Sequence, residues 1–353
     1  MSPLTREQRH KELFPDAPPF RVRQMEEVLF KPNFAGWKDV TVFPKEMREK
    51  MEEGIPWMSV ELSRMFESKR GDTFKAILET EDGLKFETVL MGNATEQWTV
   101  CVSSQVGCAM RCVFCATGAM GLKRSLTADE ITDQIRFWRA FLSERGGEAG
   151  RISNVVFMGM GEPLANAENV KKAINVWLKN TDLGPTHITV STVGVLKVMD
   201  QILTDREWPN VRIAVSLHSA DQEERAKIVP STEPKFLEKL ADWCHKYAQE
   251  LGNRRHHLTF EYTLIQGVND SEEQAEKLAR FLEKAGKPKL NVIPLNAVTG
   301  KTMKKSSQEC IDRFKAVILK HGIDVTQRRT MGDDIAAACG QLATEAAGCE
   351  QRN

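Results

Sequence analysis

Short apolar runs and longer amphipathic runs alternate along most of this chain. The apolar, β-rich runs cover residues 98–103, 152–158, 187–191, 211–217, 257–265, 290–295 and 323–329, and the amphipathic helical runs cover residues 168–180, 233–251, 271–286 and 306–322. Valine- and isoleucine-rich strands between helices are typical of parallel strands whose two faces are covered by crossover helices. The pattern predicts about six to seven β/α units, and therefore an α/β fold that forms a partial or complete (β/α) barrel.

The first part of the chain has a different character. Residues 1 to about 75 are charged and interrupted by prolines, with short helical stretches at 20–30 and 44–51, so we expect a small helical accessory domain there. Strand-like runs at 74–80 and 86–90 flank a turn signal at 81–83 and predict a hairpin. Capping boxes at 127–130 and 271–274 mark two helix starts. We divide the chain into an accessory domain (1–75), a main domain (76–345) and a tail (346–353).

The composition of the chain indicates where the protein is located, but it says little about the function. Lysine plus arginine and aspartate plus glutamate each number 49 in 353 residues, so RNA binding would depend on local basic patches. No apolar run approaches the roughly 20 residues that span a bilayer, and the N-terminus lacks the apolar core of a signal peptide. We expect a cytoplasmic monomer without membrane contact. In a reducing compartment its eight cysteines are metal ligands or catalytic thiols in preference to disulfides.

Three cysteines lie together in the spacing CxxxCxxC, namely Cys108, Cys112 and Cys115. Three thiolates on one loop can hold three irons of a [4Fe-4S] cluster and leave the fourth iron open, whereas ferredoxin clusters take four cysteines. The alternative is a structural zinc site. Zinc usually takes four ligands in paired spacings, and no second pair lies nearby. The spacing therefore favours a cluster with an open iron.

Polar motifs follow several of the predicted strands. They are GMGEP at 159–163, STVG at 191–194, SLHS at 216–219 and Asn296. In (β/α) barrels the loops after the strands gather around one cavity, so these side chains should lie together. Glycines allow a close approach of the backbone, while hydroxyl, imidazole and amide groups suit a ribose or carboxylate ligand. Each motif has a structural alternative as a tight turn or a helix cap.

Two further cysteines stand apart from the CxxxCxxC group. Cys339 lies among alanines near the C-terminus, where a lone cysteine is usually a small buried hydrophobic residue. The neighbouring glycines and the Gly-Asp-Asp turn instead suggest a loop that presents a thiol. Cys101 lies seven residues before Cys108; a fourth ligand there would leave no open iron.

Taken in order, the motifs CVSSQVGC, FCATG, FMGMGEP, STVG, SLH, FEY with GVND, and GDDIxAACGQL closely resemble the RlmN/Cfr family of radical S-adenosylmethionine (SAM) RNA adenine methyltransferases. The resemblance covers about residues 20 to 345 and implies a partial (β/α) barrel of the radical SAM type. By this resemblance, the cluster ligands are Cys108, Cys112 and Cys115. The residues that contact SAM are Gly161, Glu162, Ser191, Ser216, Leu217, His218 and Asn296. Cys339 is the cysteine that becomes methylated, Cys101 the second catalytic thiol and Glu87 the proton acceptor.

The resemblance also implies a reaction and its partners. One SAM methylates Cys339, a second SAM on the open iron yields a radical that activates this methyl group, and Cys101 releases the product by forming a disulfide with Cys339. The implied product is an adenine methylated at carbon 2 in 23S rRNA, with tRNA as another candidate substrate and an unidentified electron donor. Methylation at carbon 8, as in Cfr, and a zinc-stabilised RNA-binding module without catalysis remain the alternatives.

Basic pairs are candidate contacts to the RNA backbone, although such pairs are more often solvated charges. They are Lys123 and Arg124, Arg254 and Arg255, and Arg328 and Arg329, together with Arg21, Arg23 and Lys31 of the accessory domain. Cys244, Cys310 and Cys349 have no predicted role.

Overall fold

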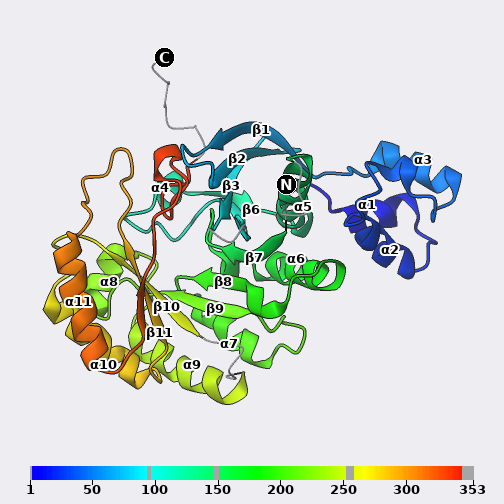
Figure 1. Cartoon of the computed structure of the whole chain (residues 1–353). Helices are drawn as coiled ribbons and strands as arrows, with labels where there is room; N and C mark the ends of the chain where they lie inside the picture. Colours follow the sequence, from blue (N-terminus) through cyan, green and yellow to red (C-terminus); the bar gives the residue numbers. More distant parts are fainter. Residues whose placement is uncertain (1, 94–96, 146–150, 252–257, 344–353) are drawn as a thin grey trace.

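The computed structural model describes residues 2–93, 97–145, 151–251 and 258–343, and a ten-stranded sheet lies at its centre (Figure 1). In spatial order the strands are β1 (Val60–Glu67), β2 (Thr73–Thr80), β3 (Lys85–Gly92), β4 (Trp98–Cys101), β7 (Ile152–Phe157), β8 (Ile188–Thr192), β9 (Arg212–Ser216), β10 (Thr259–Leu264), β11 (Lys289–Pro294) and β12 (Val325–Gln327). Strands β5 (Gln105–Gly107) and β6 (Leu122–Ser125) form a separate pair.

The sheet has an antiparallel part and a parallel part. Strands β1 to β4 pair antiparallel, whereas every pairing from β4 to β12 is parallel. Spatial order follows chain order, so each crossover advances the sheet by one strand. Strands β1 and β12 remain at its edges, so the sheet is open, as in the partial (β/α) barrel that we predicted.

The helices connect these strands and cover the sheet (Figure 1). They are α4 (Ala116–Met120), α5 (Ala128–Glu144), α6 (Ala167–Asn180), α7 (Leu196–Thr204), α8 (Gln222–Ile228), α9 (Phe236–Glu250), α10 (Glu272–Lys284) and α11 (Gln308–Lys320), with short 3-10 turns at Trp37–Asp39, Pro163–Asn166, Pro185–His187 and Asp333–Ile335. The predicted strands and long helices of the barrel are confirmed. Helices α4, α7 and α8 had not been predicted, and α4 and α8 span only five and seven residues.

The side chains of strand β10 alternate between a face that packs against helices and a face that carries polar groups. Tyr262 packs against Phe314 of α11, and Phe260 packs against Phe281 of α10. Because successive side chains of a strand point to opposite faces, Glu261 and Thr263 lie on the other face. That face carries the polar side chains of the barrel.

The capping boxes differ from each other. The box at Thr127 and Glu130 is complete. Ser271 accepts a hydrogen bond from the Gln274 amide, but Gln274 Oε1 has no hydrogen-bond partner among the described residues. The second box is therefore only half formed.

The N-terminal helices α1 (Arg6–Leu13), α2 (Phe20–Val28) and α3 (Lys45–Gly54) form a lobe beside the barrel (Figure 1). Helices α2 and α3 confirm the predicted helical stretches. The prediction that residues 1–75 are helical was wrong beyond residue 59, because β1 and the start of β2 lie in this range. Strand β1 is an edge strand with many exposed residues, so its pattern lacks the continuous apolar run by which the other strands were recognised.

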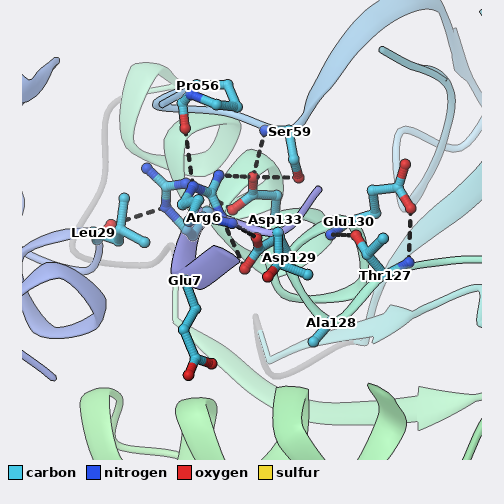
Figure 2. A network of polar contacts seen from close by, with 12 residues as sticks. Arg6, Glu7, Leu29, Pro56, Ser59, Thr127, Ala128, Asp129, Glu130 and Asp133 are labelled. Carbon is cyan, nitrogen blue, oxygen red and sulfur yellow. Dashed lines mark hydrogen bonds and ion pairs between the residues drawn. The ribbon is translucent and has the colours of Figure 1, made fainter. Parts of the chain in front are cut away.

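A buried ionic network attaches this lobe to α5 (Figure 2). The Asp133 carboxylate, fully buried, pairs with Arg6 and accepts hydrogen bonds from the amide and hydroxyl of Ser59 at 2.6 and 2.7 Å. Arg136 donates to Asp133 at 2.6 Å and to the Leu29 carbonyl at 2.9 Å. Burial alone would raise the pKa of Asp133, but the two guanidinium groups outweigh it and hold that pKa at about 2.

The basic pair Arg254 and Arg255, together with Cys349 and the predicted tail (346–353), lies outside the described residues. No helix within the described ranges combines the length and the apolar character needed to cross a bilayer.

We predict that Asp133→Asn lowers the free energy of unfolding by about 3–5 kcal/mol, because it removes the carboxylate of buried Arg136 and leaves buried Arg6 with only Asp129, at 3.5 Å. The pKa of Asp133 lies below its ordinary value of 3.8, so its contribution is complete above that pH and is lost as the pH falls through about 2. Chemical denaturation of both proteins across this pH range measures the effect.

Asp182→Asn is the matched control, since Asp182 forms an exposed ion pair with Arg151 at 2.6 Å. It should cost no more than about 1 kcal/mol. Equal losses in the two variants would contradict the assignment of the Asp133 network as a buried anchor.

Candidate active site

The three clustered cysteines lie between β5 and α4. Cys108 donates its amide to the Gly121 carbonyl at 3.0 Å, and the Cys115 amide donates to the Cys112 carbonyl at 3.1 Å. Gly107 has φ +79°, and a Cβ there would lie 1.8 Å from the Gly121 carbonyl oxygen, so only glycine fits. The β5–β6 pair thus closes the base of a loop that holds all three thiols, which we name the cysteine loop (residues 108–115).

The charges of these thiols act on one another within the cysteine loop. Burial is the main cause that raises the pKa of Cys108, to about 12, and a charge on Cys115 raises it further. Burial, Cys115 and Cys108 likewise raise the pKa of Cys112. Thiolates in this setting need nearby positive charge, which iron would provide.

The donor set fits an iron–sulfur cluster better than a single ion. Among the described residues, no three or more histidine, cysteine, aspartate or glutamate side chains gather closely enough to hold one metal ion. A [4Fe-4S] cluster needs no such convergence, because each cysteine binds a different iron. The cysteine loop also packs against an apolar cluster that includes Ile228, Val229, Ile265 and Leu295, which limits access of water.

The GMGEP motif follows β7. Gly161 has φ +98°, and a Cβ there would lie 2.5 Å from Gln105 Cβ. The buried Glu162 carboxylate accepts the amides of Leu164 and Val193, each at 2.9 Å, and its pKa is raised by burial. Glu162 therefore connects the end of β7 to the end of β8, and its remaining lone pairs could accept hydrogen bonds from an ammonium group.

The ends of β8 and β9 bring the next predicted residues together. The hydroxyls of Ser191 and Ser216 lie 3.2 Å apart, and the amide of buried Leu217 donates to the Glu261 carbonyl at 2.9 Å. Ser191, Ser216 and Leu217 thus occupy one edge of the parallel sheet, as the alternation of strands and helices predicted.

His218 occupies a constrained position beside the cysteine loop. Its φ of +61° lies in the left-handed region, and its ring meets Phe114 edge-on with centroids 4.8 Å apart. Nδ1 accepts the Thr263 amide at 3.0 Å, so the ring proton lies on Nε2. Burial, together with the charge of Arg225, lowers the pKa of His218 to about 3. His218 is therefore a neutral imidazole that can donate from Nε2.

Cys101 and Cys339 are 238 positions apart in the sequence, yet the charge of Arg328 affects the pKa of both. Burial is the first cause that raises the pKa of Cys101, and a charge on Cys339 is the second. Cys339 is exposed, yet the protein around it is dense enough that burial raises its pKa as well. Arg328 lowers the pKa of both thiols, and both cysteines are free.

Comparisons with known proteins agree with this geometry. The Radical SAM superfamily profile matches residues 102–282. The chain is 40% identical to a probable dual-specificity RNA methyltransferase RlmN of Dictyoglomus thermophilum, over 92% of this chain and 90% of that one. It is 38% identical to the ribosomal RNA large subunit methyltransferase N of Nitrosopumilus maritimus, over 88% of each chain. A radical SAM methyltransferase from Sphaerobacter thermophilus superimposes with a TM-score of 0.85 at 36% identity, over 96% of this chain and 97% of that one.

The chain belongs to the RlmN family of radical SAM RNA methyltransferases. It is therefore an enzyme that methylates RNA with a [4Fe-4S] cluster and SAM as cofactors, as predicted. This excludes the non-catalytic zinc module.

In this RlmN-family enzyme, Glu87 and Asn296 lie around the loop of Cys339. Lys75 Nζ lies 3.7 Å from Glu87 Oε1 and donates to the Ala336 carbonyl at 3.2 Å. Asn296 donates to the Cys339 carbonyl at 3.0 Å and accepts from the Thr330 hydroxyl at 3.1 Å. Both predicted residues therefore reach the loop that carries Cys339, Glu87 through Lys75 and Asn296 directly.

Lys75, Glu261 and Arg225 also belong to the site, although the sequence did not predict a role for them. A charged residue inside an apolar strand was the available signal for Lys75 in β2 and Glu261 in β10. Arg225 belongs to the run QEERAK, which is typical of a solvated helix, so no sequence signal distinguished it.

Several of the candidate RNA contacts have partners within the protein. Lys31 pairs with Glu27 at 3.2 Å, and Arg21 donates to Gln24 Oε1 at 2.8 Å. Arg124 pairs with Asp82 at 2.6 Å and with Glu130 at 2.8 Å. Arg328 pairs at 2.9 Å with Glu261, which also accepts from Asn291 at 2.9 Å. Arg328 therefore serves the thiol environment more directly than the RNA backbone.

We predict that Arg328→Met raises the pKa of Cys339, because the variant removes the cation and leaves Glu261, whose charge raises that pKa. Iodoacetamide reacts with the thiolate, so alkylation of Cys339 at fixed pH should slow by on the order of three- to ten-fold. Peptide mass spectrometry across pH measures the rate.

Arg329→Met removes the neighbouring charge while Arg328 stays in place, and it should leave the alkylation profile unchanged. Identical profiles for Arg328→Met and the unmodified enzyme would show that Arg328 does not control this thiol.

Proposed function

We propose that this enzyme methylates carbon 2 of an adenine in 23S rRNA, and of an adenine in tRNA, with Cys339 as the methyl carrier. The supporting observation is that the Ala116 amide donates to the Gly340 carbonyl at 2.8 Å, which places the segment of Cys339 against the cysteine loop. A charge on Cys339 also raises the pKa of Cys101. The names of two relatives support an RNA substrate, since one is a large-subunit ribosomal RNA methyltransferase and the other a probable dual-specificity RNA methyltransferase.

The chemistry of the target explains why a protein-bound carrier is needed. Carbon 2 of adenine has neither a basic lone pair nor an acidic proton, so it does not attack the methyl group of SAM directly. Bound together, the cluster and SAM supply a carbon-centred radical that can activate an otherwise inert methyl group. The thiolate of Cys339 is the nucleophile that first accepts the methyl from SAM.

The Cys339 loop is suited to this role. Its thiol is exposed, so a substrate can reach it, while Asn296 and Lys75 hold its backbone from two sides. Arg328 favours the thiolate form that methyl transfer requires. The residues that would hold the cluster are Cys108, Cys112 and Cys115, and those that would hold SAM are Gly161, Glu162, Ser191, Ser216, Leu217, His218 and Asn296.

Product release would use Glu87 and Cys101. After the methylene radical has added to the ring, the adduct would also have to lose one electron, for which the cluster would be the acceptor, and Glu87 would accept the proton lost from the ring carbon. The Cys101 sulfur would attack the Cys339 sulfur, forming a disulfide while the electron pair of the carbon–sulfur bond leaves with the carbon, which then takes up a proton. A reductant must afterwards restore both thiols, and we therefore place the enzyme in the reducing cytoplasm.

We predict that the anaerobically purified enzyme, with SAM, a reductant and 23S rRNA, yields 2-methyladenosine in nuclease digests analysed by mass spectrometry. Cys339→Ala should abolish the product, because the methyl carrier is lost. Cys310→Ala is the control and should retain activity, since Cys310 lies in α11 outside the site.

Each alternative has its own readout in this assay. 8-Methyladenosine in place of 2-methyladenosine would establish the carbon 8 reaction. An undiminished yield from Cys339→Ala would refute the methyl-cysteine route, and a parallel reaction with tRNA tests the second substrate.

A further inference from the structure

Arg225 is a buried arginine without an acidic partner. It lies in α8 with 1% of its surface exposed, and no carboxylate in the described ranges forms an ion pair with it. By contrast, the buried arginines Arg6 and Arg136 both pair with Asp133. Because burial of an uncompensated charge is costly, an unpaired guanidinium at this depth requires an explanation.

Neutral groups satisfy its hydrogen bonds but not its charge. Nε donates to the Leu217 carbonyl at 3.0 Å, Nη2 to the Val193 carbonyl at 2.5 Å and Nη1 to the Thr232 hydroxyl at 2.7 Å. The guanidinium carbon lies 3.7 Å from the centre of the Phe236 ring, which adds a cation–π contact. Burial lowers the pKa of Arg225 to about 9, so the group is still charged at neutral pH.

The cysteine loop lies against the same helix. The Val113 amide donates to the Ile228 carbonyl at 3.0 Å, and Cys112 packs in one apolar cluster with Ile228 and Val229. Burial lowers the pKa of Arg225, and a thiolate at Cys112 would raise it. The positive charge therefore lies between the strand ends of the proposed SAM site and the proposed cluster ligands.

We propose that Arg225 is a positioning residue that supplies the counter-charge of the iron–sulfur cluster and stabilises its reduced form. Three thiolates on a doubly positive [4Fe-4S] core leave a net negative charge, and one electron from an external reductant increases it. A fixed cation in a low-dielectric setting favours that added charge. The inference rests on the proposed cluster ligands and is independent of the RNA substrate.

The test is the reduction potential of the cluster in the full-length, anaerobically purified protein without RNA. Dithionite titration with redox mediators, followed by absorbance and electron paramagnetic resonance, measures it. In Arg225→Gln and Arg225→Met, the ratio of reduced to oxidised cluster at the wild-type midpoint should fall at least tenfold, a shift of about 59 mV for one electron. Arg225→Lys keeps the charge and should remain within about threefold of the wild type.

Lys227→Met is the matched control, because it removes an exposed charge from the same helix and should leave the potential unchanged. A second route leaves Arg225 in place, in case its neutral variants do not fold. Thr232→Asp puts a carboxylate where Arg225 now finds a hydroxyl, and it should lower the potential relative to the neutral Thr232→Asn.

The possible outcomes distinguish an effect of the Arg225 charge from an effect of its hydrogen bonds. They also distinguish failure of this inference from failure of the proposed cluster ligands. A wild-type potential in the neutral variants, or equal potentials in Thr232→Asp and Thr232→Asn, would overturn the inference. So would an equal loss in Arg225→Lys and Arg225→Gln, which indicates a purely structural role. Absence of a cluster from the wild-type protein would overturn the proposed ligands and this inference together, whereas a cluster with an unchanged potential would overturn this inference alone.

Discussion

Three hydrogen bonds hold the cysteine loop and the start of α4 in place, and the arrangement of the site depends on them. The Val113 amide binds the end of α8, the Ala116 amide donates to the Gly340 carbonyl at 2.8 Å, and the Thr117 hydroxyl donates to the Leu342 carbonyl at 2.6 Å. Figure 1 shows the C-terminal segment beside α4 accordingly. The segment that carries Cys339 is thereby fixed against the segment that carries the proposed cluster ligands, more than 220 residues earlier.

The charged side chains at three places in this protein have different kinds of partners. In the network around Asp133, arginines and carboxylates compensate one another and attach the N-terminal lobe. At the thiols, Arg328 is balanced by Glu261 and acts on both Cys101 and Cys339. At the cysteine loop, the partners of Arg225 among the described residues are all neutral. A buried charge left unbalanced by side chains is consistent with a cofactor that brings negative charge to that place.

Most elements with a clear apolar pattern were predicted from the sequence, whereas β1 and α8, which lack one, were missed. The apolar residues of strand β10 and helix α10 follow patterns typical of a strand and of an amphipathic helix, so both elements were predicted. Strand β1 was missed because an edge strand is stabilised by the ladder to β2 more than by its own apolar side chains. Helix α8 was missed because it is short and because its one decisive residue, Arg225, looks like a solvated charge.

The amino-acid sequence alone determined the barrel class, the cysteine spacing and the candidate residues at the strand ends, because these depend on local periodicity and on residue identity. The tertiary structure decided which distant groups affect one another. A charge on Cys339 raises the pKa of Cys101, Arg328 pairs with Glu261, and the helix of Arg225 binds the cysteine loop through the Val113 amide. The physical reason is that these effects depend on how parallel strands bring their ends to one edge. Burial there, which no local pattern records, then changes the pKa of each group.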